Sequence, residues 1–300
     1  MLRPFELHRP RTAEDACALL ARLGEDAAPY AGGTELLLLM KLGLLRPRHL
    51  VDVKRLPGFD AIADGGRVTL GAAVTHRAVE RSALVSERCA LVSAVARHVA
   101  NVRVRNVGTV GGNLAFADPH SDLATLFLTL DALVALVSPR GRREVALADF
   151  TRGAWDTARE ADELLACVRL TPWPQGTAAV YVKFGVHERP TLGVALALLL
   201  DGARVREARL AIGCVDPRPL RLASAEARLR GVAVTDLEDA CTAVGELAAN
   251  GVEPDDDLHG SADYKREMVA VFVRRALRIA AARARGDASP VPHFPHAIIL

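Results

Sequence analysis

Two glycine-rich segments carry the residue types in this sequence that could hold a phosphate group. The first reads PYAGGTEL over residues 29–36, where a short strand runs through Gly-Gly into an apolar stretch with helical character. Glycines let backbone N–H groups converge without interference from Cβ atoms, and such a nest of amides can bind a pyrophosphate. The dinucleotide fingerprint G-x-G-x-x-G is absent, so an ordinary tight turn explains this one segment at least as well.

The second segment reads NVGTVGGNLA over residues 106–115, and Asp118-Pro119-His120-Ser121-Asp122 follows it closely. Its glycines again offer N–H donors for a phosphate, while Asp122 offers the acceptor that a sugar hydroxyl needs. A glycine-rich turn capped by Asp-Pro is the alternative. Two such segments in one chain favour a shared dinucleotide ligand over two unrelated turns.

The cysteines argue against a metal site on this chain. There are five, Cys17, Cys89, Cys167, Cys214 and Cys241, and none forms a C-x-x-C pair. Scattered cysteines fit neither an iron–sulfur cluster nor a zinc site, and their odd number argues against a disulfide framework. No metal ligand is predicted, and an iron–sulfur partner would have to be a different chain.

Composition narrows the class further. At 300 residues and 32.0 kDa the chain has room for two domains. A formal net charge of +2, with acids and bases interspersed, gives no basic face for nucleic acid. The first residues contain no signal-peptide core, and the apolar stretch 194–200 is too short to cross a bilayer. These features predict a cytoplasmic protein without a membrane span.

Hydrophobic periodicity and turn residues indicate which elements position the two segments. In the first half, Thr12 caps a helix that ends at Gly24, and Asp64-Gly65-Gly66 joins two strands of a hairpin. Residues 102–112 are rich in valine and broken by glycine, and 121–130 reads as a helix or a strand–helix junction. The other elements expected there are strands at 5–7, 28–31, 49–53 and 132–137 and helices at 36–42, 77–82 and 89–98.

A proline-rich stretch, TPWPQG over residues 171–176, is the best candidate linker. Beyond it the sequence predicts strands at 178–186, 193–201 and 204–215 and helices at 223–229, 236–249 and 262–284. The chain ends in the apolar residues Ile298-Ile299-Leu300, which a free tail would not need, so we expect this tail to be docked on some surface.

A set of strings then resembles one known family across residues 5 to 284. The strings are AGGTELLLLMK, RPRHLVDV, GAAVTH, VRNVGTVGGNLAFADPHSDL and YVKF. They are similar to the FAD-binding medium subunit of molybdenum hydroxylases, which includes the flavin parts of xanthine dehydrogenase and carbon monoxide dehydrogenase. The chain departs from that pattern at Arg103, where members often have Gln, and at Thr34-Glu35, where carbon monoxide enzymes often have His-Ser.

The resemblance implies an α+β fold with a two-subdomain FAD-binding domain of the vanillyl-alcohol-oxidase (PCMH) type. This domain would span residues 1–174, with subdomains of about 1–56 and 57–174. A smaller C-terminal domain like that of the carbon monoxide dehydrogenase flavoprotein, with a three-stranded sheet and helices, would span 175–286. Residues 287–300 would form a tail.

The same resemblance implies a set of FAD contacts. Residues 31–36 would wrap the pyrophosphate, and Thr109, Gly112 and Asn113 would hold its other side. Asp122 would accept a hydrogen bond from the ribityl or adenosine part, Leu165 would pack near the flavin ring, and Lys183 would approach its polar edge. A cation there would stabilise the anionic reduced flavin. The first segment's contacts would be Ala31, Gly32, Gly33, Thr34, Glu35 and Leu36.

By this resemblance the chain is an FAD-dependent oxidoreductase subunit that takes electrons from a small [2Fe-2S] subunit and passes them to NAD, a quinone or oxygen. Substrate oxidation would occur on a large molybdenum-cofactor subunit, in a dimer of heterotrimers, and this chain would carry no catalytic residue of its own. The alternative is a standalone FAD-dependent oxidoreductase, for which His76, His98 and His120 are the plausible acid–base candidates. A flavin-binding sensor or assembly module is a third, non-enzymatic possibility.

Overall fold

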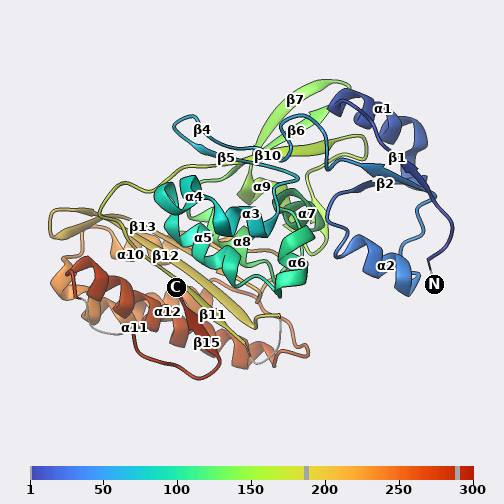
Figure 1. Cartoon of the computed structure of the whole chain (residues 1–300). Helices are drawn as coiled ribbons and strands as arrows, with labels where there is room; N and C mark the ends of the chain where they lie inside the picture. The colour runs from blue at the N-terminus through green and yellow to red at the C-terminus, as the bar shows by residue number, and fades with distance from the viewer. Residues whose placement is uncertain (1, 186–188, 288–290) are drawn as a thin grey trace. The chain divides into compact units, whose positions relative to one another are not determined.

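The computed structural model describes residues 2–185, 189–287 and 291–300, and its chain packs into two compact units (Figure 1). The first unit contains the chain up to Ala117 together with Ala132–Thr171, and the second contains Asp118–Asp131 and Pro172–Leu300. The expected α+β class is confirmed. The finer boundaries at 56, 174 and 286 stay predictions.

The first unit opens with a small parallel sheet. Its strands β1 (Glu6–His8), β3 (His49–Asp52) and β2 (Ala27–Tyr30) lie side by side in that order. Helix α1 (Ala13–Leu23) starts where the Thr12 side chain accepts the Asp15 amide and ends at Gly24, as the sequence predicts. Helix α2 (Leu36–Leu42) follows the first glycine segment.

A five-stranded antiparallel sheet in the order β4-β5-β10-β6-β7 forms the rest of this unit with its helices. The hairpin predicted at residues 64–66 is confirmed by the pairing of β4 with β5. The strands are β4 (Ile62–Asp64), β5 (Val68–Gly71), β6 (Leu133–Ser138), β7 (Gly141–Ala146) and β10 (Leu164–Leu170), with a separate pair β8 (Thr151–Gly153) and β9 (Asp156–Thr157). The helices are α3 (His76–Arg81), α4 (Ala83–Arg88), α5 (Ala90–Arg97), α6 (Val102–Val107), α7 (Val110–Phe116) and α9 (Leu147–Phe150).

The valine-rich stretch at 102–112 forms two short helices, α6 and α7, although valine favours strands. The Asn101 side chain caps α6 by accepting the amides of residues 103 and 104. The Thr109 hydroxyl caps α7 by accepting the Gly112 amide. These two caps outweigh the modest helix penalty of a β-branched residue.

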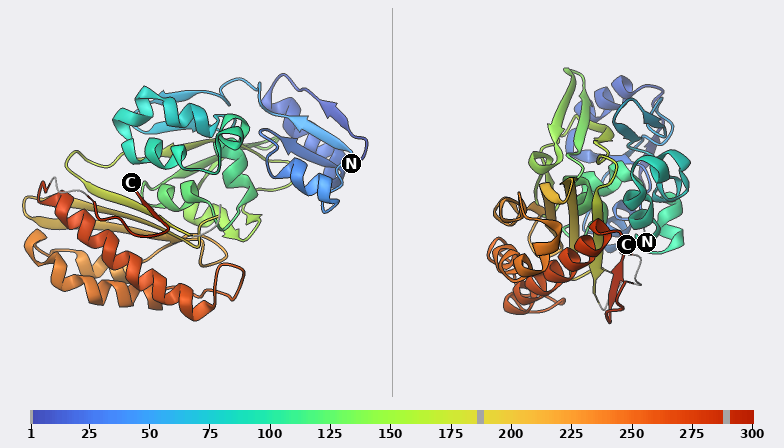
Figure 2. Two further views of the ribbon diagram at one scale, coloured as in Figure 1. Left: turned by 60° about the horizontal axis from the view of Figure 1, so that its bottom comes forward. Right: turned by 90° about the vertical axis from the view of Figure 1, so that its left-hand side faces the viewer.

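The second unit is built on a sheet in the order β14-β13-β12-β11-β15. Its three long antiparallel strands confirm the sequence prediction, and two short edge strands widen the sheet to five. Helices α11 and α12 lie along one face (Figure 2). The strands are β11 (Ala178–Phe184), β12 (Leu192–Asp201), β13 (Arg204–Gly213), β14 (Leu220–Arg221) and β15 (Ala297–Ile299); the helices are α8 (Asp122–Leu128), α10 (Ala223–Leu229), α11 (Leu237–Asn250) and α12 (Ala262–Ala284).

Strand alternation divides the side chains of β11 between the two faces of this sheet. Val180, Val182 and Phe184 join the apolar core beneath α11 and α12. Tyr181 and Lys183 therefore point to the opposite face, where both contact Asp122 at the start of α8. This alternation assembles the polar cluster described below.

The apolar tail is docked rather than free, as the sequence predicts, and the structure places it against strand β11 of the same chain. Strand β15 pairs with β11, and the Leu300 amide and carbonyl bond to Tyr181. Further back, the Arg275 guanidinium lies between the rings of Phe272 and Phe294. The expected strand end at Val186 and the start of the tail at 288–290 lie outside the described residues.

No helix in the described ranges is both long and apolar enough to cross a membrane.

Candidate functional site

The first glycine segment connects β2 to α2 and packs against the second glycine segment within the same unit. A Cβ atom on Gly32 would lie 2.2 Å from the Val107 carbonyl oxygen and 2.8 Å from Gly108 Cα. Gly33 has a φ of +70°, and a Cβ there would lie 2.6 Å from the Tyr30 ring. Because both positions accept only glycine without rearrangement, the backbone at 32–33 is held in one shape against residues 107–108.

A second feature of this segment is its three consecutive backbone amides, those of Gly32, Gly33 and Thr34. Within the described part of the chain, none of these three N–H groups donates a hydrogen bond to another residue. The segment is only partly buried, so a ligand can reach it. Three consecutive donors without a protein acceptor are suited to phosphate oxygens, and contacts of FAD with residues 31–36 stay predictions.

The second segment differs, and here the expectation of a nest of free amides is wrong. The Val110 and Gly111 amides donate to the carbonyls of Val74 and Ala72, both at 2.9 Å. The amides of residues 112 and 113 donate to Thr109, through its Oγ1 at 3.0 Å and its carbonyl at 2.9 Å. A ligand would meet side chains here rather than backbone donors. Contacts of FAD with Thr109, Gly112 and Asn113 stay predictions.

The glycines of this second segment serve close packing instead. A Cβ on Gly111 would lie 2.5 Å from Ala72 Cβ and 2.7 Å from its carbonyl oxygen. A Cβ on Gly108 would lie 2.9 Å from the Val104 carbonyl oxygen and 3.2 Å from the His76 ring. These approaches fix the backbone against which Gly32 rests.

The three histidines considered as acid–base candidates are held by their surroundings. His76 is buried behind Gly108, and burial, with the Arg105 charge second, lowers its pKa to about 4, so it is neutral at pH 7. His120 contacts Asp118 Oδ1 through Nδ1 at 3.1 Å and lies against the His259 ring. His98 is the C-terminal cap residue of α5.

In the second unit, two predicted site residues, Asp122 and Lys183, are in direct contact. Its carboxylate is 6% exposed, accepts the Tyr181 hydroxyl at 2.9 Å and forms an ion pair with Lys183 Nζ at 2.7 Å. Burial, followed by the Asp122 charge, raises the pKa of Tyr181 well above its ordinary value, so this hydroxyl stays a donor. The structure thus pairs Asp122 with Lys183, while the FAD contacts proposed for each stay predictions.

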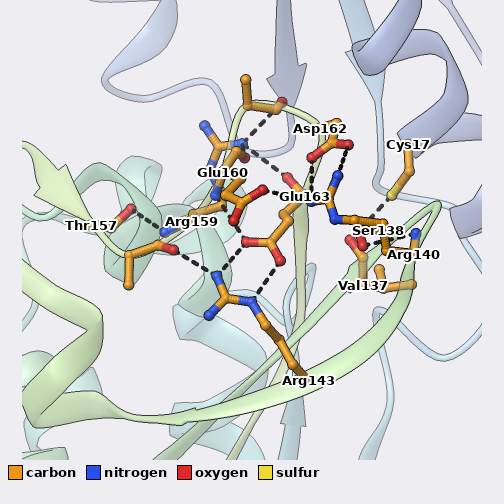
Figure 3. Close-up of polar contacts among 12 residues, drawn as sticks. Cys17, Val137, Ser138, Arg140, Arg143, Thr157, Arg159, Glu160, Asp162 and Glu163 are labelled. Carbon is orange, nitrogen blue, oxygen red and sulfur yellow. Dashed lines mark hydrogen bonds and ion pairs between the residues drawn. The ribbon is translucent and has the colours of Figure 1, made fainter.

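Leu165, the expected neighbour of the flavin ring, is buried in β10 just before a register shift of that strand. The turn that leads into it is held by ion pairs (Figure 3). The Glu163 side chain is 3% exposed, and its carboxylate accepts two hydrogen bonds from Arg143, both at 2.7 Å. It accepts a third from the Glu160 amide at 2.9 Å. Arg140 binds Asp162 in the same turn.

Sequence reasoning missed this network, although a signal for it is present. The strings RGRRE at 140–144 and READE at 159–163 carry opposite charges. Their contact depends on the pairing of β6 with both β7 and β10. Charge patterning alone does not reveal that pairing.

The Glu163–Arg143 pair makes the folding stability of the protein depend on pH in the acid range. The hydrogen bonds from Arg143 hold the pKa of Glu163 below its ordinary value of 4.5. This contribution is therefore complete above pH 4.5 and is lost as pH falls through the lower, folded-state value. We expect chemical unfolding at pH 7 and pH 3 to show a larger loss of stability in wild type than in Glu163→Gln. An equal loss in both proteins would contradict the assignment.

Comparison of the chain with known proteins identifies its family. Residues 3–173 match the family described as FAD binding domain in molybdopterin dehydrogenase, and residues 186–280 match the CO dehydrogenase flavoprotein C-terminal domain. The chain is 36% identical over 282 residues to the carbon monoxide dehydrogenase medium chain of Hydrogenophaga pseudoflava, covering 93% of this chain and 98% of that one. It is 29% identical over 285 residues to the xanthine dehydrogenase FAD-binding subunit of Escherichia coli O157:H7, covering 93% and 97%.

Solved structures agree with these matches. A chain of the Cu,Mo-CO dehydrogenase in its cyanide-inactivated form aligns with a TM-score of 0.90 at 34% identity, covering 94% of this chain and 99% of that chain. A chain of quinoline 2-oxidoreductase from Pseudomonas putida 86 aligns with a TM-score of 0.88 at 31% identity, covering 95% and 99%. The chain therefore belongs to the FAD-binding medium subunits of the molybdenum hydroxylases, a family of oxidoreductase components.

Proposed function

We propose that this chain is the electron-transfer subunit of a molybdenum hydroxylase. It takes electrons from a small [2Fe-2S] subunit and passes them through FAD to NAD, a quinone or oxygen. The observation that supports this most directly is the run of three unclaimed amides at Gly32–Thr34, held in place by the contact of Gly32 with Val107. Bound FAD would supply the electron-carrying chemistry, and the protein its binding and orientation.

The roles proposed for the residues are those that the family resemblance implies. Residues 31–36 bind the pyrophosphate, with Thr109, Gly112 and Asn113 beside it. Leu165 provides an apolar surface that excludes water from the ring. Asp122 and Lys183 hold the polar groups of the cofactor, and their mutual ion pair keeps both side chains in one orientation.

The cysteines support an iron–sulfur cluster on a separate chain. Burial raises the pKa of Cys17, Cys89 and Cys241 to about 11, which disfavours the thiolate that binds iron. Among the described residues, no cysteine belongs to a group of three potential metal ligands. Relatives of this chain are named medium chain or medium subunit, which supports the presence of a small and a large partner subunit. We propose that the complex is a dimer of heterotrimers in the cytoplasm.

Purification of the native assembly tests the proposal. We expect iron, molybdenum and FAD in the complex, with one FAD on each copy of this chain. We also expect the flavin to be reduced by substrate only when all subunits are present, as followed by flavin absorbance under anaerobic conditions. Recovery of this chain as a flavoprotein that oxidises a substrate unaided would instead support the standalone oxidoreductase. FAD binding without turnover with any acceptor, even in the presence of partners, would support a sensor or assembly module.

A further inference from the structure

We propose that Glu6, His8 and His49 form a binding site for a divalent transition metal ion, with Zn²⁺ as the reference ion. These three residues are hereafter the Glu6–His8–His49 cluster. The proposal concerns a part of the first unit that the FAD-binding residues do not use, and it does not depend on the proposed function. The sequence predicts no metal site because that prediction considers cysteines, whereas this cluster is made of imidazoles and a carboxylate.

The sheet brings the three side chains together. Glu6 and His8 are two residues apart on β1, so their side chains leave the same face of the strand. His49 lies on β3, and in the parallel pairing of β1 with β3 it is the direct partner of Glu6. The cluster is therefore fixed by two hydrogen-bonded strands, although 41 residues separate His8 from His49.

The distances suit ligation of one ion. His8 Nε2 lies 3.0 Å from His49 Nδ1, and Glu6 Oε2 lies 3.5 Å from the same nitrogen. One ligand atom from each residue lies within 4.8 Å of the others. Two nitrogens bound to a tetrahedral Zn²⁺ at about 2.0–2.1 Å lie about 3.3 Å apart, so only a small widening of the His8–His49 separation is needed.

The chemistry of the donors selects the class of ion. Imidazole nitrogens suit Zn²⁺, Cu²⁺ and Ni²⁺, whereas Mg²⁺ and Ca²⁺ prefer oxygen ligands. The side chains of His8 and His49 are 17% and 24% exposed and that of Glu6 is 65% exposed, so a hydrated ion can reach the cluster. Among the described residues, this is the one such group of three histidine, cysteine or acidic side chains.

Binding would cross-link the edge strand β1 to the central strand β3. Strand β1 has three residues and, among the described strands, pairs with β3 alone. A metal ion that binds the folded sheet and not the unfolded chain stabilises the fold by mass action. We therefore expect Zn²⁺ to raise the melting temperature of the first unit as well as to bind.

The test uses the full chain without a histidine tag, freed of metals with a chelator and titrated with ZnCl₂ against a chromophoric competitor. We expect one equivalent of Zn²⁺ whose affinity falls by at least about tenfold in both His8→Gln and His49→Gln. The control His293→Gln removes an exposed histidine elsewhere and should leave that equivalent unchanged. Flavin absorbance and the far-ultraviolet circular dichroism spectrum report whether each variant is folded.

Glu6→Gln is a third variant at the most exposed member of the cluster, where a folding defect is least expected. It should weaken Zn²⁺ binding and abolish most of the rise in melting temperature. The proposal is overturned if wild type and the three cluster variants bind the same number of Zn²⁺ equivalents with the same affinity. It is also overturned if His293→Gln alone loses the equivalent.

Discussion

Gly32→Ala should weaken FAD binding to the chain by at least about tenfold, which corresponds to about 1.4 kcal/mol of binding free energy. The new Cβ would lie 2.2 Å from the Val107 carbonyl oxygen and 2.8 Å from the Val107 carbonyl carbon. These are backbone atoms, so relief requires the segment itself to move, and overpacking of this kind costs about 1–3 kcal/mol. Movement at residue 32 displaces the three amides that are proposed to bind the pyrophosphate.

The ratio of flavin absorbance to protein after gel filtration measures this effect, and circular dichroism shows whether the fold persists. Gly65→Ala is the matched control. Gly65 lies in the exposed β4–β5 turn, its φ is not in the left-handed region, and an added Cβ meets nothing within 4 Å. If the Gly32→Ala protein is folded and retains as much FAD as the Gly65→Ala protein, the first segment does not bind the cofactor.

The first glycine segment also shows how far the sequence leads. The strand, the Gly-Gly turn and helix α2 are local features, and α2 spans the predicted residues 36–42. The free amides at 32–34 follow from this local geometry, and the phosphate site predicted there stays a prediction. By contrast, the amides of Val110 and Gly111 are used by Val74 and Ala72, some forty residues earlier in the chain. Local pattern carries no information on such long-range acceptors, so the sequence could not show that the amides of the second segment are already hydrogen-bonded.

The Glu6–His8–His49 cluster and the Glu163–Arg143 pair were missed for the same reason. Each requires knowledge of which strands are neighbours, because His49 is 41 residues from His8 and Glu163 is 20 residues from Arg143 in sequence. Residues 102–112 are a different case, since the capping signals of Asn101 and Thr109 are local and visible in the sequence. Valine favours strands, so the composition of this stretch did not suggest helices, although the two capping residues mark where helices α6 and α7 begin.

Asp122→Ala should be among the most destabilising single changes in the second unit, by about 3–5 kcal/mol. It removes the carboxylate that Lys183 Nζ and the Tyr181 hydroxyl both bind, in a place where the Lys183 side chain is 12% exposed. A buried ammonium that loses the carboxylate beside it forfeits that attraction, while the desolvation cost of the ammonium remains. Guanidinium unfolding followed by tryptophan fluorescence measures the loss, since Trp173 lies in the same unit and donates to the Thr129 carbonyl.

Removing both charges separates the ion pair from the contribution of each residue. The double variant Asp122→Asn/Lys183→Met should be more stable than the sum of its single variants predicts, with a coupling energy of about 1–3 kcal/mol. Additive effects would contradict the direct pairing seen between the two side chains.

The same three proteins test whether Lys183 acts on the flavin. If its ammonium lies at the polar edge of the ring, Lys183→Met should lower the flavin midpoint potential, by about 30 mV for each 1.4 kcal/mol of lost stabilisation of the reduced form. The double variant should lie nearer to wild type, because the paired charges sum to zero in both proteins. Unchanged FAD affinity and potential in Lys183→Met would restrict Lys183 to holding Asp122, so the pair would be a structural element of the second unit rather than a part of the cofactor site.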